Sequence, residues 1–279
     1  MCKITKFSIL LVSCVQAVIA WAQSVNHTVY DVEVDYEMTY YPDSNERSIQ
    51  KEYMELLIND RESVFQSKRK GRLDSARYAN IASGAKVSAD FLYDNATKFR
   101  YYIVKSKDSI VTRDEYRLSS EHDYHYYVEH KKDFNWILRE DTTSIGGMLC
   151  QLAEVDFGGR RWMAWFTTEI PMSEGPYKFS GLPGLILSMK DTTGDWRFDF
   201  VGVRNIARKV PTFYDWTSPP SFTDKKKFFK EKKYYNENKV ILEEAAGRIR
   251  FRDAEQRSFA LKKSIERAAK DNNWIELFP

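Results

Sequence analysis

The sequence predicts a mainly β (α+β) fold, in which a curved antiparallel sheet or half-barrel carries one or two helices. Many short aromatic segments with alternating polarity are separated by turn residues, which is typical of antiparallel strands. A stretch rich in lysine, glutamate and alanine follows near the C-terminus and favours helix. The 279 residues are 43% hydrophobic and 15% aromatic, a composition that argues against disorder.

The clearest strand runs from Val32 to Tyr40. Every even position there is apolar and every odd position is polar, so we expect a strand with one buried face and one solvated face. Shorter segments of the same kind follow along the chain. They predict strands at Lys51–Ile58, Ser63–Gln66, Phe99–Lys105, Ser109–Thr112, Tyr124–His130, Trp136–Glu140, Gln151–Phe157, Trp162–Thr167, Leu185–Lys190 and Asp195–Val203.

Helices are expected in the C-terminal part, around residues 223–271. Two segments, Asp224–Lys239 and Glu243–Asp271, lack alternation and are rich in helix formers. In the second, apolar residues recur at helical spacing and predict one apolar face: Phe251, Ala254, Leu261, Ile265 and Ala268. By contrast, Arg69–Ser88 carries scattered glycine, serine and alanine, so we expect a loop there with at most a short helix.

The N-terminus has the pattern of a secretory signal peptide, residues 1–22. Lys3 and Lys6 precede an apolar run, and Ala20-Trp21-Ala22 provides the small residues of a cleavage site. A lipoprotein cut before Cys14 is the less favoured alternative, because the residues after Cys14 stay mostly apolar. The pattern therefore predicts an exported protein in the periplasm, at the outer membrane or secreted, with residues 23–279 forming a single β-rich domain.

Charge and cysteine content exclude some classes of protein. Removal of the leader leaves a net charge of about +1, so no overall positive field favours nucleic acid as a partner. Cys150 is then the one remaining cysteine, which excludes an intramolecular disulfide. It begins an apolar strand, and we expect a buried, inert thiol.

The block from residue 146 to residue 203 is the most specific part of the sequence. Gly158-Gly159 separates two aromatic strands and predicts a hairpin turn with positive φ. The block closely resembles the GLPGLI family of secreted Bacteroidetes proteins, whose function is not established. The predicted sheet also looks like the open half-barrel of periplasmic lipoprotein carriers. The family's defining residues are Gly181, Leu182, Pro183, Gly184, Leu185 and Ile186.

The hexapeptide has a structural and a functional interpretation. In the structural one, which we favour, Leu182, Leu185 and Leu187 enter the core while Pro183-Gly184 forms a type II turn. In the functional one, the glycines let backbone amides approach a ligand closely.

Polar and aromatic side chains next to this motif are the candidate ligand-binding residues. A charged rim on an aromatic floor could hold a polar or charged ligand. The alternative is that Glu169 and Lys178 pair at the surface and do nothing further. The candidate residues are Arg160, Trp165, Glu169, Tyr177 and Lys178.

No residues are assigned to catalysis, to a metal or to a cofactor. His122, His125 and His130 lie in a strand-like segment that puts His125 on the opposite face from the other two, a poor geometry for one ion. No nucleophile elbow, zinc-protease helix, P-loop or dinucleotide fingerprint occurs. Asp191 and Asp195 flank a hairpin turn that explains their presence.

Basic residues interleave with aromatic ones from Lys225 to Tyr235. A solvated helix with one packed aromatic face is the simpler interpretation. Contact with lipid headgroups or with an outer-membrane protein is the alternative.

We therefore expect a non-enzymatic exported protein that binds an apolar ligand, such as a lipid, or an envelope partner on its aromatic sheet. An aromatic face of that size needs a cover: a helix, a ligand or a partner. The two alternatives are a hydrolase of peptides or glycans working near Glu169–Lys178, and an accessory subunit of an outer-membrane transporter.

Overall fold

A computed structural model describes residues 27–83, 86–118, 124–131, 134–211 and 221–277. The leader at residues 1–22 and Cys14 lie outside these residues, so the signal peptide and the lipoprotein alternative stay predictions. The single-domain assignment likewise stays a prediction. In the described part of the chain, no helix is both long enough and apolar enough to cross a bilayer.

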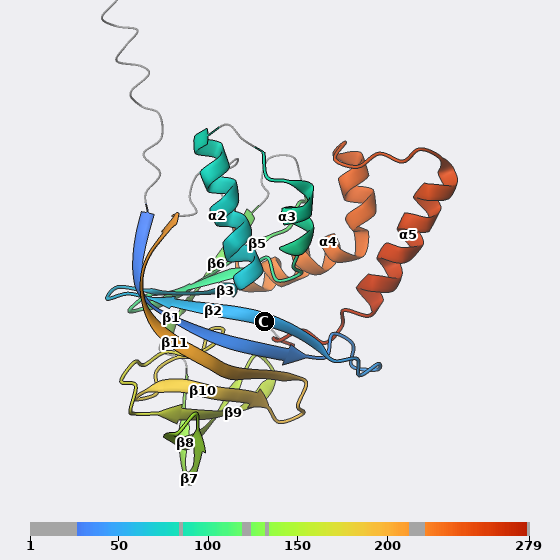
Figure 1. Ribbon diagram of the computed structural model, residues 1–279. Helices are drawn as coiled ribbons and strands as arrows, with labels where there is room; N and C mark the ends of the chain where they lie inside the picture. The colour runs from blue at the N-terminus through green and yellow to red at the C-terminus, as the bar shows by residue number, and fades with distance from the viewer. Residues whose placement is uncertain (1–26, 84–85, 119–123, 132–133, 212–220, 278–279) are drawn as a thin grey trace, which may run out of the picture.

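Among the described residues, one open, curved sheet of twelve strands dominates the fold, with four helices around it (Figure 1). Its order is β12-β6-β5-β4-β3-β2-β1-β11-β10-β9-β8-β7, and only the β12–β6 pair among these strands is parallel. The mainly β prediction is confirmed. The strands are β1 His27–Tyr40, β2 Gln50–Ile58, β3 Ser63–Ser67, β4 Tyr102–Lys105, β5 Ser109–Glu115, β6 Tyr124–His130, β7 Ile137–Ile145, β8 Met148–Phe157, β9 Arg160–Thr167, β10 Leu185–Asp191, β11 Trp196–Pro211 and β12 Ser221–Phe222.

Each of the eleven predicted strands has a counterpart in this sheet, with shifts at the ends. The largest extension is β11, which continues to Pro211 because it pairs with β1 along its whole length. Strand β12 was not expected from the sequence; its two residues pair with His125 and Tyr126 of β6. Two residues are too few for a period of two to be visible.

The alternation in β1 is confirmed for its apolar face. We call this side of the sheet the inner face, and there Val34 lies in register with Leu56 of β2, Phe65 of β3 and Ile103 of β4. All four side chains have 0% exposure. This row forms the centre of one large apolar core that extends to Phe166 and Leu187 on the other side of β1.

The expectation that the polar side of β1 is solvated is wrong at two positions. Glu33 and Asp35 are buried, because helix α2 (Lys68–Ser83) packs over this part of the outer face. Lys68 lies 2.7 Å from Asp35 and 3.2 Å from Glu33. Arg204 of β11 bonds both carboxylates from the other side.

Helix α2 also corrects the predicted loop at Arg69–Ser88. The Ser67 hydroxyl accepts hydrogen bonds from the first amides of the helix, at 3.2 Å from Arg69 N and 3.4 Å from Lys70 N. Gly71, which favoured a loop in the sequence, allows the helix to approach the sheet. A Cβ on it would lie 2.3 Å from Glu55 Oε1. A second short helix, α3, spans Ala89–Asp94.

The two C-terminal helices are confirmed as α4 (Lys225–Ala245) and α5 (Ala254–Ala269). Phe228 and Tyr235 of α4 pack against Tyr116, which follows β5, and Tyr127 of β6, which gives the tethered aromatic face that was expected. Helix α5 differs from the prediction. It packs on α4, stands away from the sheet in Figure 1 and has no buried residue, while Ile265 of its predicted apolar face is 60% exposed.

Candidate functional site

The hairpin at Gly158-Gly159 forms as predicted, between β8 and β9. Both residues have positive φ, 62° and 78°. Gly158 is also covered by the C-terminal segment, since Leu277 N donates to the Gly158 carbonyl at 2.7 Å. A Cβ on Gly158 would lie 2.8 Å from Glu276 Cγ, so the position requires glycine for two reasons.

Arg160 follows this turn and holds the C-terminal segment in place. Its guanidinium donates to the carbonyls of Trp274 (2.7 Å) and Ile275 (3.2 Å) and to Asn273 Oδ1 (2.5 Å). Its remaining nitrogen bonds Asp191 at 2.7 Å. The side chain is buried and its donors are used within the chain, so the structure gives Arg160 a structural role, and its predicted part in a ligand-binding rim stays a prediction.

A loop that we call the crossing segment, residues 168–184, lies over the inner face of the sheet. Phe179 is fully buried and contacts the rings of Trp162 (5.0 Å) and Phe157 (5.3 Å). On the far side of the core, Lys105 of β4 donates to the Gly175 carbonyl at 2.7 Å. The cover that the aromatic face needs thus comes from a loop of the same chain, which the sequence analysis did not consider.

Glu174 anchors the middle of the crossing segment. Its carboxylate lies 2.7 Å from Lys105 Nζ and accepts a hydrogen bond from Ser63 Oγ at 2.9 Å. Burial alone would raise the pKa of Glu174, but the charges of Lys105 and Lys131 hold it below its ordinary value. Burial lowers the pKa of Lys105.

Lys178 lies at the centre of a second buried charge cluster. Its side chain is 0% exposed, and its Nζ lies 2.5 Å from both Glu129 and Glu276 and donates to Tyr127 at 2.7 Å. Lys225, at the start of α4, reaches the same two carboxylates at 2.6 Å and 2.7 Å. The suggested surface pair of Glu169 and Lys178 is therefore wrong.

Two opposing effects set the pKa values in this cluster: burial, and the charges of the neighbouring side chains. Burial would raise the pKa of Glu276, but Lys178 and Lys225 outweigh it and lower that pKa to about 2. Tyr177 donates to Glu276 Oε1 at 2.6 Å, and burial together with that carboxylate raises the pKa of Tyr177 well above its ordinary value. Tyr177 has a φ of 54°, unusual for a residue other than glycine.

The leucines of the hexapeptide lie in the core, as the structural interpretation expects, although the turn differs; that the motif has only a structural role stays a prediction. Leu182, Leu185 and Leu187 are buried at 2%, 0% and 0% exposure. The type II turn at Pro183-Gly184 is wrong, since Gly181 rather than Gly184 has positive φ (96°). Gly184 is needed for another reason: a Cβ there would lie 1.9 Å from the Thr167 carbonyl oxygen.

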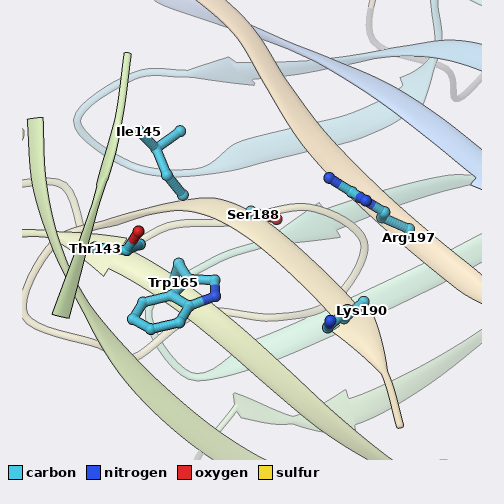
Figure 2. Close-up of a pocket in the computed structure, with 6 residues that line it drawn as sticks. All are labelled: Thr143, Ile145, Trp165, Ser188, Lys190 and Arg197. Carbon is cyan, nitrogen blue, oxygen red and sulfur yellow. The ribbon is translucent and has the colours of Figure 1, made fainter. Parts of the chain in front are cut away.

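Trp165 and Glu169 lie elsewhere. Trp165 points to the outer face of the sheet, into an open hollow of about 230 Å³ (Figure 2). Glu169 accepts a hydrogen bond from Leu149 N at 2.7 Å, at the start of β8. Figure 2 shows the hollow spanning β7 to β11, lined by Thr143, Ile145, Trp165, Ser188, Lys190 and Arg197.

The five candidate residues thus do not form one site. Arg160, Tyr177 and Lys178 are buried and hold the C-terminal and crossing segments, whereas Trp165 and Glu169 are near the β7–β9 end of the sheet. Glu276 and Asn273, which complete the buried clusters, were not among the predicted site residues. No local signal could have found them, because the candidate residues that they bond, Lys178 and Arg160, are 98 and 113 residues away.

The remaining candidates have structural explanations. Cys150 is buried, and burial raises the pKa of its thiol. His125 is buried and stacks on Tyr116 with ring centroids 4.0 Å apart, while His130 is exposed and His122 lies outside the described residues. Asp191 and Asp195 flank a turn in which Gly194 has a φ of 71°.

Comparison with known proteins gives a short family match. A family model described as "Protein of unknown function (Porph_ging)" matches residues 158–188, within the block that carries the GLPGLI resemblance. No curated protein matches the chain.

Solved structures show similarity of fold. PNGF-II, in its P21 crystal form, superposes with a TM-score of 0.51 at 11% identity over 72% of this chain. The match spans only about a third (33%) of the PNGF-II chain. The match to LolA superfamily protein NE2245 from Nitrosomonas europaea (TM-score 0.26, 9% identity) covers 70% of this chain and 94% of the NE2245 chain. The match to a putative outer membrane lipoprotein-sorting protein domain from Vibrio parahaemolyticus (TM-score 0.24, 8% identity) covers 69% of this chain and 91% of that domain.

Proposed function

We propose that this is an exported, non-enzymatic binding protein that engages an envelope partner along strand β7. One observation carries the proposal. The β7 end of the sheet combines a strand edge that no described strand pairs, exposed apolar side chains and the Trp165 hollow. The exposed residues are Ile137 (47%), Leu138 (52%) and Leu149 (64%).

The backbone of β7 supports binding of an extended segment. β7 is the last strand in the described sheet, and an outer strand can pair with a further strand from a partner. Its first half is irregular, with a register shift between Leu138 and Thr142 and charged residues at 139–141. Its second half, Thr142–Ile145, carries no charge. We therefore place the partner segment along Thr142–Ile145.

The hollow gives this edge side-chain selectivity. Ile145 and Trp165 provide apolar surface at one end, and Lys190 and Arg197 provide positive charge at the other. Arg197 also pairs with Asp199 at 2.6 Å. An apolar side chain followed by an acidic one complements this arrangement. The recognised segment would then be an extended peptide with both kinds of residue.

The inner face offers less support for an apolar ligand. The crossing segment fills it with Tyr177, Phe179 and Leu182, which are at most 3% exposed. A lipid would have to displace these side chains from the core. The partner interpretation needs no such rearrangement.

The hydrolase alternative receives no comparable support. Glu276 has a strongly shifted pKa, but its carboxylate is fully buried and paired with Lys178 and Lys225. A structural ion cluster explains such a shift without catalysis.

Photo-crosslinking in the native envelope tests the proposal. A photoreactive phenylalanine analogue at Ser144 or Leu149 should give one discrete crosslinked protein, whereas the same analogue at Tyr93 (84% exposed) should not. Identification of that protein as an outer-membrane transporter would select the accessory-subunit form of the proposal. Crosslinking to lipid alone, or equal yields from Tyr93, would contradict it.

A further inference from the structure

The charge of the chain is concentrated in its C-terminal helices. Residues 225–270 contain fifteen lysines and arginines against seven aspartates and glutamates. This difference of eight exceeds the net charge of +3 for the whole chain, so the rest of the protein is net acidic. Such an asymmetry points to an anionic partner for this region.

Helix α4 has two faces with different roles. Phe228 and Tyr235, seven residues apart, face the sheet and are buried. Lys227, Lys230 and Tyr234 recur at a spacing of three and four, which places them together on the opposite side of the helix. Tyr234 is 54% exposed.

Further exposed lysines flank this outward face. Lys226 and Lys233 are exposed, and Ile241 continues the face beyond the irregular residue Asn238 with 49% exposure. Acidic neighbours compensate only part of the charge, through side-chain pairs at helix spacing. These pairs are Lys227–Glu231 at 3.7 Å and Lys233–Glu237 at 3.8 Å.

Helix α5 adds apolar side chains to the same helical pair. Phe259 is 63% exposed and Ile265 60% exposed. Lys263 lies beside the Phe259 ring, 5.9 Å from its centroid, and also contacts Glu266 at 2.9 Å. In Figure 1 helix α5 stands away from the sheet, whereas the first part of α4 packs on β6.

We infer that the α4–α5 pair docks on an anionic lipid surface. Helices that lie in a membrane interface combine cations with exposed aromatic and aliphatic side chains, and this combination is present here. The lysines would contact phosphate headgroups while Tyr234, Ile241, Phe259 and Ile265 enter the boundary between headgroups and acyl chains. This binding is independent of the β7 edge and would position that edge near envelope partners.

Vesicle flotation with the purified mature protein tests the inference. We expect binding to vesicles of phosphatidylcholine with 30% phosphatidylglycerol at least tenfold tighter than to pure phosphatidylcholine vesicles, and weakening as salt rises. Binding that ignores the anionic lipid, or no binding to either vesicle, would overturn the inference.

Two variants with the same change in net charge test whether binding depends on the α4–α5 pair or only on the charge of the whole chain. Changing Lys226, Lys227, Lys230 and Lys233 to Glu should weaken binding at least tenfold. Changing four exposed basic residues elsewhere to Glu should change it less than twofold; these are Arg61, Lys86, Lys107 and Lys209. Equal loss in both variants would show a non-specific charge effect and contradict the proposed surface. Thermal unfolding midpoints confirm that both variants fold.

A third variant tests the apolar contribution. Phe259→Ser with Ile265→Ser leaves the charge unchanged, and we expect severalfold weaker binding at high salt, where the lysines are screened. Unchanged binding would show that the lysines alone hold the protein on the vesicle, and it would contradict the insertion of apolar side chains into the bilayer. Binding of soluble polyglutamate by a wild type that binds no vesicle would overturn lipid docking and indicate an acidic protein partner instead.

Discussion

Lys178 and Glu276 are 98 residues apart in the chain, yet Lys178 Nζ and Glu276 Oε1 lie 2.5 Å apart with neither side chain exposed. This contact joins the crossing segment to the C-terminal segment. Lys225 joins both to helix α4 through the same carboxylate. Residues that looked like a ligand site in the sequence therefore hold three distant parts of the chain together.

Removing the Lys178 charge should strongly destabilise the fold. Lys178→Met leaves buried carboxylates without one of their cations, and we expect a loss of about 3–5 kcal/mol in the free energy of unfolding. Urea denaturation measures it, with Lys209→Met as the exposed control. Adding Glu276→Gln to Lys178→Met should recover part of the loss. A Lys178→Met protein as stable as the control would contradict the role of the cluster.

Stability should fall in acid because of Glu276. Its pKa is about 2 in the folded protein against an ordinary value of 4.5. A lowered folded-state pKa gives stability that is fully present above about pH 4.5 and is lost as the pH falls toward 2. The contribution is on the order of 3 kcal/mol. Urea midpoints should therefore agree at pH 7 and pH 5 and fall at pH 3, and Glu276→Gln should flatten this fall.

Gly184 should not tolerate a side chain. The Cβ of Gly184→Ala would lie 1.9 Å from the Thr167 carbonyl oxygen, so the backbones of two adjacent strands must separate. We expect little soluble, folded protein. Gly202→Ala is the matched control, because a Cβ there has no neighbour within 4 Å and its φ is not positive. Normal melting of Gly184→Ala would show that the close approach is not required.

Arg160 should determine the order of the C-terminal segment. Arg160→Met removes the donors to Asn273, Trp274 and Ile275, so we expect faster amide hydrogen exchange across residues 271–277. Protection in β8 and β9 should persist. Unchanged exchange near Ile275 would mean that the Glu276 cluster holds the segment without Arg160.

Local patterns in the sequence were sufficient to predict eleven of the twelve described strands and the glycine turn. The period of two from Val32 to Tyr40 and the Gly158-Gly159 turn each depend on neighbouring residues, and both are confirmed. Helix α2 was not predicted because a glycine such as Gly71 can indicate either a loop or a helix that packs closely on its neighbour. It weakens a helix in isolation, but here it allows close packing on Glu55.

By itself, the sequence determined that this chain forms an antiparallel, aromatic sheet with turns at particular glycines, because backbone preference and side-chain alternation act over a few residues. Only the tertiary structure decided which polar residues near the hexapeptide are buried. Arg160, Tyr177 and Lys178 became internal because their partners, Asn273 and Glu276, arrive from the far end of the chain. Trp165 remained at the surface since its strand turns it to the opposite face of the sheet.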